Sequence, residues 1–391
     1  MKIGIITAHV WNNYGSLFQA YALSVFLRKH HNSVEIIDYH QISDSSKIST
    51  LYKSVRSDGI VKTLIIVINI IKSTLIHRLN KQHFNKLSYE CNLFRQRYLP
   101  LSGKKYTSSD QLKQISSKYD AYIVGSDNIW LFIQVTDSIP VHMKPYLLDF
   151  VDSNKLKIAY APSMGEPNLP DGKHDNIIHY LNSFDALSVR GLSTVRLIES
   201  LPNTNPVFNA LDPTFLLSEA NWDKDFPEIT TSPEKLPYIL IYSIYPRPSK
   251  EPIFIFSKKL AKKLGLNIIH IGHYKKYGFS HYNDVSVTEF IRYIKNASVI
   301  LTNSFHGTCF SIIFRKPFYS FMPGPIHSKT RITDLLSLFQ LSDRFVDSVE
   351  LAEKVPLNID YHQVNTIIDY ECSASKEWLL QALSIDKSRD V

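Results

Sequence analysis

The sequence predicts an α/β fold made of two doubly wound, Rossmann-like domains that face a cleft. Its 391 residues exceed what a single hydrophobic core usually supports, and 44% of them are apolar. Short apolar segments alternate with helix-like segments, which is typical of parallel sheets. The alternation restarts after Thr214. We therefore predict a first domain over residues 1–214, a second over 215–372 and a C-terminal helix or tail over 373–391.

The first half of the chain opens with a βαβ unit. A strand is predicted at Lys2 to Thr7, a helix at Ser16 to Lys29 and a strand at Ser33 to Tyr39. Further strands, with helices between most of them, are predicted at Asp120 to Gly125, Lys157 to Ser163, Ala186 to Arg190 and Val207 to Pro213. Ligands of such sheets bind beyond the carboxyl ends of the strands, so the turns after these segments are the candidate functional positions.

The second half repeats the pattern. Strands are predicted at Tyr238 to Ile244, Leu266 to Gly272, Ser298 to Leu301 and Pro317 to Met322. Helices are predicted at Pro252 to Leu264, Val287 to Ala297, Thr308 to Arg315 and Thr330 to Gln340. With two facing domains, we expect the ligand site in the cleft between them.

Charge and cysteine content narrow the partners and the compartment. A formal net charge of +8 favours anionic partners, either phosphorylated substrates or an acidic membrane surface. Lys and Arg are dispersed and no recognition module appears, so nucleic acid is not expected. Three widely spaced cysteines without metal-ligand spacing favour a reducing cytoplasm and predict no metal. The strand predicted at the N-terminus leaves no room for a secretion signal.

The segment from Ile60 to Arg78 is the nearest feature to a membrane signal. Lys62, Asn69 and Lys72 interrupt it, and its apolar runs are far shorter than the roughly 20 residues that span a bilayer. Two interpretations stay open. Residues 60–81 could form an interfacial helix on acidic lipid at the inner face of the plasma membrane, or a helix buried in the domain or in a dimer contact.

The segment from Val299 to Thr308 is the strongest candidate for chemistry. It runs from an apolar strand into a polar turn that carries Asn303, Ser304, His306 and Gly307 and opens a helix. Free N–H groups and the helix dipole favour a phosphate or carboxylate beside the His306 imidazole. The alternative is a capped turn in which His306 makes a structural hydrogen bond.

Other strand ends carry polar turns. In Asn12 to Ser16, with Asn13, Tyr14 and Gly15, the glycine allows close backbone approach to a phosphate or sugar, but the further glycines of a dinucleotide site are missing. In Val124 to Trp130, Asp127 is either a site acid or an N-cap, and Trp130 could stack on a sugar.

An arginine and a second acidic turn complete the candidate strand ends. Arg190 follows Ser188 and Val189 at the end of a predicted strand. Its guanidinium group could bind a carboxylate or phosphate through two parallel hydrogen bonds. The turn from Leu211 to Thr214 is interpreted as structural, closing the first domain.

Taken in order, five segments resemble the polysaccharide pyruvyl transferase family. They are residues 12–23, 124–130, 188–190, 211–214 and 302–308, within a resemblance that covers residues 3 to 340. The resemblance implies a GT-B-like fold and transfer of pyruvate from phosphoenolpyruvate to two hydroxyls of a sugar as a cyclic ketal. It implies that His306 is the catalytic histidine and that Arg190 binds the donor.

The chain departs from the family pattern at two positions. Ser304 stands where many members carry an arginine, and Gly191 stands where a glutamate often follows the donor arginine. We predict that Arg331, at the start of the next helix, substitutes for the missing arginine.

The combined prediction is a cytoplasmic or peripheral-membrane transferase of exopolysaccharide or capsule biosynthesis. Phosphoenolpyruvate is its co-substrate, no other cofactor is expected, and the sugar acceptor could be a lipid-linked oligosaccharide. The predicted roles are catalysis by His306 and Asp127, donor binding by Arg190, Asn303, Ser304, Gly307 and Arg331, and acceptor binding by Asn13, Tyr14, Gly15 and Trp130. The alternatives are a GT-B glycosyltransferase that uses a nucleotide sugar, and a non-catalytic glycan- or phosphate-binding protein.

Overall fold

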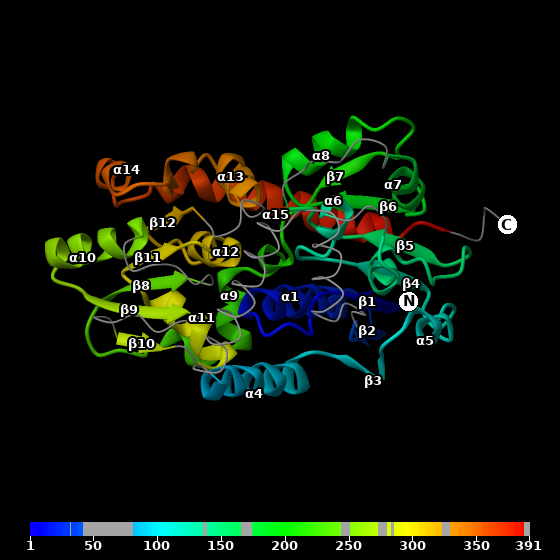
Figure 1. The fold of residues 1–391 in the computed structure, drawn as a ribbon, viewed down its shortest axis with the longest axis horizontal. Coiled ribbons are helices and arrows are strands. Elements are labelled where there is room, and N and C mark those ends of the chain that lie inside the picture. Colours follow the sequence, from blue (N-terminus) through cyan, green and yellow to red (C-terminus); the bar gives the residue numbers. More distant parts are fainter. Residues whose placement is uncertain are drawn as a thin grey trace, which may run out of the picture.

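The computed structural model describes residues 1–31, 33–41, 81–135, 139–165, 174–243, 251–272, 280–282, 285–322 and 329–386. In these residues two parallel sheets, each flanked by helices, form two neighbouring lobes (Figure 1), which confirms the prediction of two Rossmann-like, GT-B-like α/β domains. Residues 60–80 of the predicted membrane contact lie outside the described residues. No helix within the described residues is long and apolar enough to cross a bilayer.

The first sheet has the strand order β3-β2-β1-β4-β5-β6-β7, with every pair parallel. Its strands are β1 (Lys2–Ile6), β2 (Ser33–Tyr39), β3 (Leu101–Tyr106), β4 (Ala121–Val124), β5 (Leu156–Ala159), β6 (Ala186–Val189) and β7 (Val207–Asn209). Its helical segments are α1 (Tyr14–His30), α4 (Lys81–Tyr98), α5 (Ser109–Lys113), α6 (Phe132–Val135), η1 (Val141–Leu147), α7 (His174–Leu181) and α8 (Leu192–Glu199). The strand order changes direction between β1 and β4, which is where such sheets bind ligands.

The second sheet has the order β10-β9-β8-β11-β12-β13. Its strands are β8 (Tyr238–Ser243), β9 (Asn267–Gly272), β10 (Ser280–Tyr282), β11 (Val299–Thr302), β12 (Phe318–Phe321) and β13 (Phe345–Val346). The helical segments of this half are η2 (Pro213–Leu216), α9 (Glu219–Asp225), η3 (Pro227–Thr230), α10 (Pro252–Leu264), α11 (Val287–Asn296), α12 (Phe305–Ile313), α13 (Lys329–Leu338), η5 (Ser342–Arg344) and α14 (Val349–Lys354).

Helix α12 begins at Phe305, three residues before the predicted start at Thr308. The Ser304 side chain accepts a hydrogen bond from the Gly307 N–H at 3.3 Å, so Ser304 is the N-cap. His306 therefore lies in the first helical turn rather than in the loop before it.

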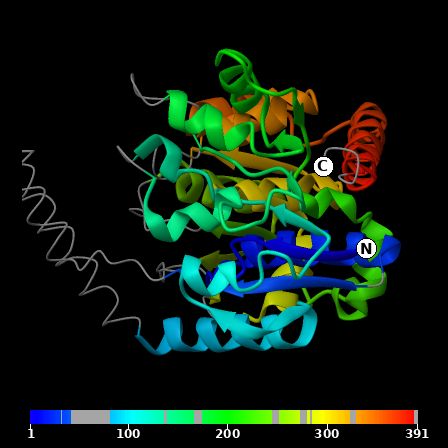
Figure 2. The same ribbon diagram turned by 90° about the vertical axis from the view of Figure 1, so that its right-hand side faces the viewer.

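Helix α15 (Tyr361–Leu383) returns from the second lobe to the first, and Figures 1 and 2 show it in red along one side of the molecule. Trp378 stacks on Phe208 at 5.5 Å, and the Ser375 hydroxyl accepts from the Leu211 N–H at 3.0 Å. The predicted boundary at residue 372 falls inside this helix, and the one at residue 214 falls in η2, between the sheets. The domain limits themselves stay a prediction.

An aromatic core joins the two lobes. The ring of Phe18 in α1 lies 5.6 Å from Trp222, 6.3 Å from Phe290 and 5.2 Å from Phe310, and all four side chains are buried. Burying one such side chain contributes about 1.5–3 kcal/mol. Because α1 and α12 both pack into this core, the turns that begin them are held in fixed positions.

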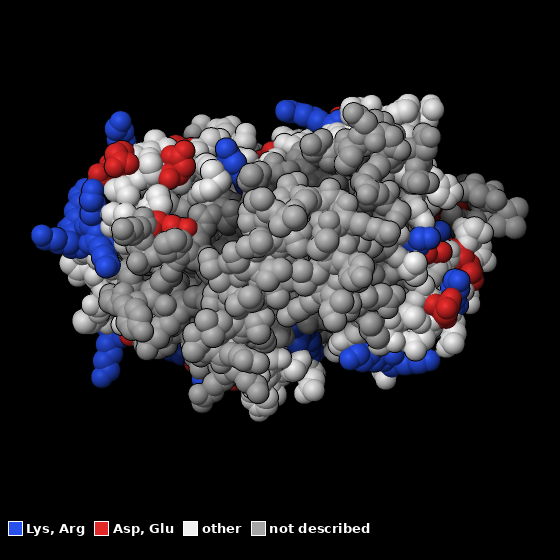
Figure 3. Space-filling view, in the orientation of Figure 1, with Lys and Arg blue, Asp and Glu red and all other residues white. Residues whose placement is uncertain are grey.

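Exposed basic residues gather away from those turns. Figure 3 shows Lys and Arg side chains at the end of the molecule that carries α10, whose lysines 258, 259, 262 and 263 are exposed. None of these lysines belongs to the site described below.

Candidate active site

The candidate active site lies where α1 and α12 begin, beyond the carboxyl ends of β1 and β11. Asn13 caps α1 by accepting from the Ser16 N–H at 3.2 Å, as Ser304 caps α12. A Cβ atom on Gly15 would lie 2.1 Å from Nδ1 of His306. The two turns therefore touch through a glycine from one lobe and a histidine from the other.

A cavity of about 180 Å³ opens beside this contact. It is lined by Trp11, Asn13, Ser16, Asp127, Asn128, Asn303, Ser304, Phe305, His306 and Arg331. The structure thus brings together predicted donor and acceptor residues from both halves of the chain. Arg331, the predicted substitute for the arginine missing at Ser304, lines the same cavity as His306.

Two acids and two bases form a buried charge cluster beside the cavity, whose wall contains Asp127 and His306 but not Arg190 or Asp212. His306 Nε2 lies 3.4 Å from Oδ2 of Asp212, and Arg190 Nη1 donates to the same oxygen. Arg190 Nη2 lies 3.8 Å from Oδ1 of Asp127. All four residues are less than a tenth exposed, so the opposite charges compensate one another in a region with little water.

The two carboxyl groups are ionised in this setting. Burial alone would raise the pKa of Asp127 and of Asp212, but the charges of His306 and Arg190 outweigh it and hold both pKa values below the ordinary range. Ser16 adds a hydroxyl donor to Asp127, and the Thr214 backbone N–H adds a donor to Asp212. Both carboxylates of the cluster are therefore negatively charged at neutral pH.

Arg190 keeps hydrogen-bonding capacity for an anion. Its Nε and Nη2 atoms are buried and have no hydrogen-bond partner among the described residues. Its guanidinium group stacks on the ring of Phe305 at 4.1 Å, and that of Arg331 lies 5.7 Å from the same ring. Two guanidinium groups thus meet at one aromatic side chain next to His306.

Backbone conformation and steric crowding explain why position 191 is a glycine. Its φ is 101°, a conformation that side chains rarely adopt, and a Cβ atom there would lie 2.7 Å from Oδ2 of Asp334. Asp334 in turn accepts hydrogen bonds from the Ser193 N–H at 2.9 Å and from its hydroxyl at 2.8 Å. A larger residue at 191 would disturb this link between α8 and α13.

Three predicted site residues have packing roles instead. Trp130 is fully buried and donates from Nε1 to the Tyr146 carbonyl at 2.7 Å, so the prediction that it stacks on a sugar is wrong. Tyr14 is buried against Phe290, with ring centroids 4.4 Å apart, and does not line the cavity. Gly307 gives its N–H to the Ser304 cap, and a Cβ there would lie 2.3 Å from Thr302 Oγ1.

Sequence reasoning missed Asp212 as a site residue. It was expected to close a structural turn, and its Oδ1 does accept from Thr214, but its other oxygen faces His306 and Arg190. The signal lies in strand adjacency. Strands β6 and β7 pair with Val189 opposite Asn209, so the residues after both strands lie at the same sheet edge.

A second cluster was also missed, because its members come from two separate strand ends. His9 follows β1, Asp38 is in β2 and His40 follows it, and β1 pairs with β2. These three residues are the group of side chains within the described chain that could hold a metal ion.

The fold and the charge cluster define a two-domain, Rossmann-like α/β protein with a histidine, two carboxylates and two arginines at its domain interface. The family described as "Polysaccharide pyruvyl transferase" matches residues 13–325. Because this is well over half of the 391 residues, the chain belongs to the polysaccharide pyruvyl transferase family and is a transferase of that type. Arg331 lies beyond the matched residues.

Comparison with curated sequences and with solved structures gives different results. No curated protein matches the chain in sequence. The fold is similar to that of UDP-GlcNAc 2-epimerase from Methanocaldococcus jannaschii, with 12% identity, 98% of this chain and 99% of that chain covered, and a TM-score of 0.49. It is also similar to that of ADP-heptose lps heptosyltransferase II from E. coli, with 10% identity, coverages of 95% and 99%, and a TM-score of 0.38.

Proposed function

We propose that this transferase moves pyruvate from phosphoenolpyruvate onto two hydroxyls of a sugar in a polysaccharide precursor, forming a cyclic ketal and releasing phosphate. Family membership supports pyruvyl transfer. The observation that carries the donor assignment is the meeting of Arg190 and Arg331 at the ring of Phe305. Phe305 and Arg331 line the same cavity as His306, and the buried Arg190 lies behind Phe305.

The donor is a small, highly charged anion with a phosphate and a carboxylate. Arg190 would bind one of these groups through its free Nε and Nη2 donors, and Arg331 would bind the other. The start of α12 adds the positive end of its dipole. In this proposal Arg331 supplies the positive charge that Ser304 does not.

The reaction balances without an oxidant or reductant. The methylene carbon of phosphoenolpyruvate gains a proton and becomes a methyl group. Two C–O bonds form between C2 and the sugar oxygens, and the bond from C2 to the phosphate oxygen breaks. Of the two hydroxyl protons, one replaces the proton given to the methyl carbon, and the other leaves with phosphate.

His306 would be the group that moves these protons. Histidine is suited to general acid–base catalysis near neutral pH. The ionised Asp212, 3.4 Å from Nε2, would stabilise the imidazolium that forms when His306 takes a hydroxyl proton. Asp127, held by Ser16, would orient the acceptor hydroxyls or share in the proton transfer.

The acceptor would enter over the turn that begins α1. Asn13 and Asn128 supply amide groups there, and the half-buried Trp11 offers the ring face that Trp130 does not. This proposal also includes a lipid-linked form of the acceptor, a cytoplasmic location and a membrane contact through residues 60–81. It includes transfer chemistry without a metal.

The test is to incubate the protein with phosphoenolpyruvate and a panel of free and lipid-linked oligosaccharides. We expect phosphate release that depends on the acceptor, and a product heavier by pyruvic acid less one water. A parallel panel of nucleotide sugars tests the alternative activity. Nucleotide release without phosphate release from phosphoenolpyruvate would make the protein a glycosyltransferase, and saturable binding of phosphoenolpyruvate with no turnover would make it a binding protein.

A further inference from the structure

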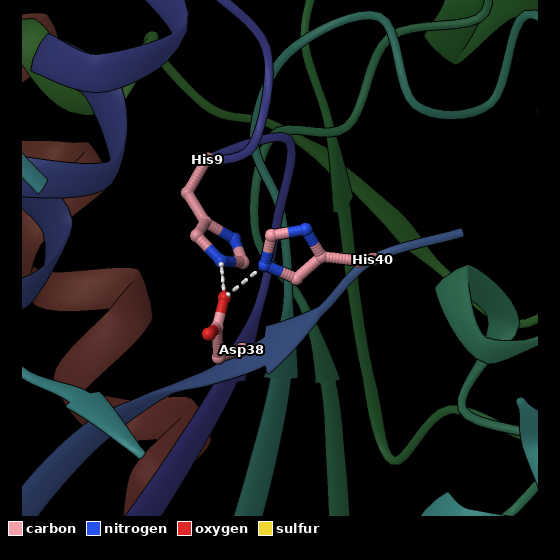
Figure 4. Close-up of side chains that lie close together, drawn as sticks. All are labelled: His9, Asp38 and His40. Carbon is pink, nitrogen blue, oxygen red and sulfur yellow. Dashed lines mark hydrogen bonds and ion pairs between the residues drawn. The ribbon is translucent and has the colours of Figure 1, made fainter. Parts of the chain in front are cut away.

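His9, Asp38 and His40 form a compact polar cluster at the carboxyl ends of β1 and β2. His9 Nε2 lies 2.9 Å and His40 Nε2 lies 2.7 Å from the same oxygen, Oδ1 of Asp38. Figure 4 shows both imidazole rings directed at this carboxylate from two separate segments. The three ligand-type atoms lie within 4.8 Å of one another.

The hydrogen bond on the other side of His9 fixes its orientation. Nδ1 lies 3.1 Å from the carbonyl oxygen of Thr7, which can only accept, so Nδ1 carries a proton. Nε2 then faces a carboxylate oxygen, and a second proton or a bound cation must lie between the two atoms. A ring that gives one N–H to a backbone carbonyl and directs its other nitrogen at a shared point is the usual arrangement of a metal-bound histidine.

We infer that His9, Asp38 and His40 bind one divalent transition-metal ion of the zinc type. Two imidazole nitrogens and one carboxylate oxygen are ligands that zinc accepts. At zinc–ligand distances of about 2.0–2.1 Å, tetrahedral ligand atoms lie roughly 3.3 Å apart. The observed separations of 2.7 and 2.9 Å need to open by only a few tenths of an ångström.

The cluster has one side open for a further ligand. The His9 side chain is fully buried, whereas those of Asp38 and His40 are 18% and 34% exposed. The ion therefore has three ligands from the protein and a fourth from water. This composition excludes Mg²⁺ and Ca²⁺ as the preferred occupants, since both favour oxygen ligands.

The position of the cluster indicates what the ion does. It joins the end of β1 to the end of β2 at the base of the loop that carries Trp11 and Asn13 to the cavity. Arg95 already holds this loop, donating from Nε to the His9 carbonyl at 2.7 Å and from Nη2 to the Trp11 carbonyl at 2.8 Å. The ion gives the loop a second attachment, to the end of β2, and takes no part in the transfer chemistry.

The test is calorimetric titration of Zn²⁺ into the full chain, stripped with a chelator and carrying no histidine tag. We expect one ion per chain with micromolar or tighter affinity, unaffected by millimolar Mg²⁺ or Ca²⁺. His40→Gln and Asp38→Asn should weaken binding by at least about 100-fold, more than loss of a supporting group does. His179→Gln, on an exposed histidine of α7, is the matched control and should bind as the unaltered chain does.

Co²⁺ substitution gives a readout that is independent of enzyme activity. A site with two nitrogen ligands and one oxygen ligand should give visible d–d absorption that saturates at one equivalent and is lost in His40→Gln, a change at a partly exposed position. If the unaltered chain binds no Zn²⁺ at micromolar concentration, or if His40→Gln binds it equally well, the inference is wrong and the cluster is a hydrogen-bonded ion pair.

Discussion

The turns that begin α1 and α12 have the same local construction but contribute different things to the site. Each follows the strand of its sheet at which the strand order changes direction, and each is capped by a side-chain oxygen, Asn13 Oδ1 in one and Ser304 Oγ in the other. Each also has a glycine just inside the helix. Gly15 makes room for His306 of the opposite lobe, whereas Gly307 makes room for Thr302 of its own lobe.

The difference shows that one turn supplies space and the other supplies the reactive group. A capped, glycine-containing turn after a strand is a general way to begin a helix closely packed on a sheet. This construction alone does not identify the turn that takes part in the chemistry. The surrounding charged groups identify it, and here Asp212, Arg190 and Asp127 gather around His306.

The largest expected effect comes from removing the reactive group from the α12 turn. His306→Asn keeps a side chain of similar size and polarity but cannot exchange protons near neutral pH. We expect pyruvate transfer to fall by about 10²–10⁴-fold, as for loss of a general acid–base group. Phosphate release from phosphoenolpyruvate measures it. The matched variant His362→Gln, on the exposed surface of α15, should retain full activity, and an active His306→Asn enzyme would remove His306 from the mechanism.

The next effect tests the carboxylate that faces the α12 turn. Asp212→Asn leaves Arg190 and His306 without their buried partner, which should lower the free energy of unfolding by about 3–5 kcal/mol at neutral pH. Urea unfolding measures the loss. Asp110→Asn, at a position whose side chain is 90% exposed, is the control and should change stability by less than about 0.5 kcal/mol.

The same variant predicts a pH dependence with a definite sign. The pKa of Asp212 is lower in the folded protein than in the unfolded chain, because His306 and Arg190 overcome the cost of burial. Its stabilising contribution is then present above the unfolded pKa of about 3.9 and is lost as the pH falls through the lower folded value. The difference in free energy of unfolding between the unaltered protein and Asp212→Asn should become smaller only below about pH 4. A gap that closed nearer neutrality would contradict the assignment.

A smaller effect tests the space that the α1 turn provides. Gly15→Ala places a methyl group where His306 Nδ1 lies 2.1 Å from the ideal Cβ position, so the imidazole must move. Alanine is also the better helix former, so α1 itself should not suffer. We expect activity to fall about 100-fold, the usual cost of misplacing a reacting group by about 1 Å.

The control for this change lies in the same lobe. A Cβ atom on Gly103 meets no atom within 4 Å, so Gly103→Ala should leave turnover unchanged. Equal activity of the two variants would show that the approach of Gly15 to His306 has no functional importance.

The fold was predictable because the buried strands are apolar and regularly spaced, as in β1, β4 and β8, whose interiors are fully buried. Strand β3 was missed because it lies at the edge of its sheet and has the sequence Leu-Ser-Gly-Lys-Lys-Tyr, with three exposed residues in a row. A local sequence pattern reveals a strand through its buried apolar residues, and an edge strand has few of them.

The site was predictable only as far as residues adjacent in sequence share a turn. His306, Ser304 and Asn303 follow one strand, and their common position at the cavity was expected. Asp212 was not, because its contact with Arg190 depends on β6 and β7 being neighbours. Trp130 was placed wrongly because its burial comes from tertiary packing, which a polar turn before it does not reveal.

The smallest expected effect compares the two caps directly. Asn13→Ala and Ser304→Ala each remove one side-chain acceptor, at 3.2 and 3.3 Å, and each should lower the free energy of unfolding by about 1 kcal/mol. Their effects on turnover should differ. Ser304 fixes the helical turn that carries His306, so its loss should cost roughly tenfold in activity, whereas loss of Asn13 should cost less because its turn carries no reacting group. Equal losses of stability with a larger loss of activity for Asn13→Ala would reverse the roles that we assign to the two turns.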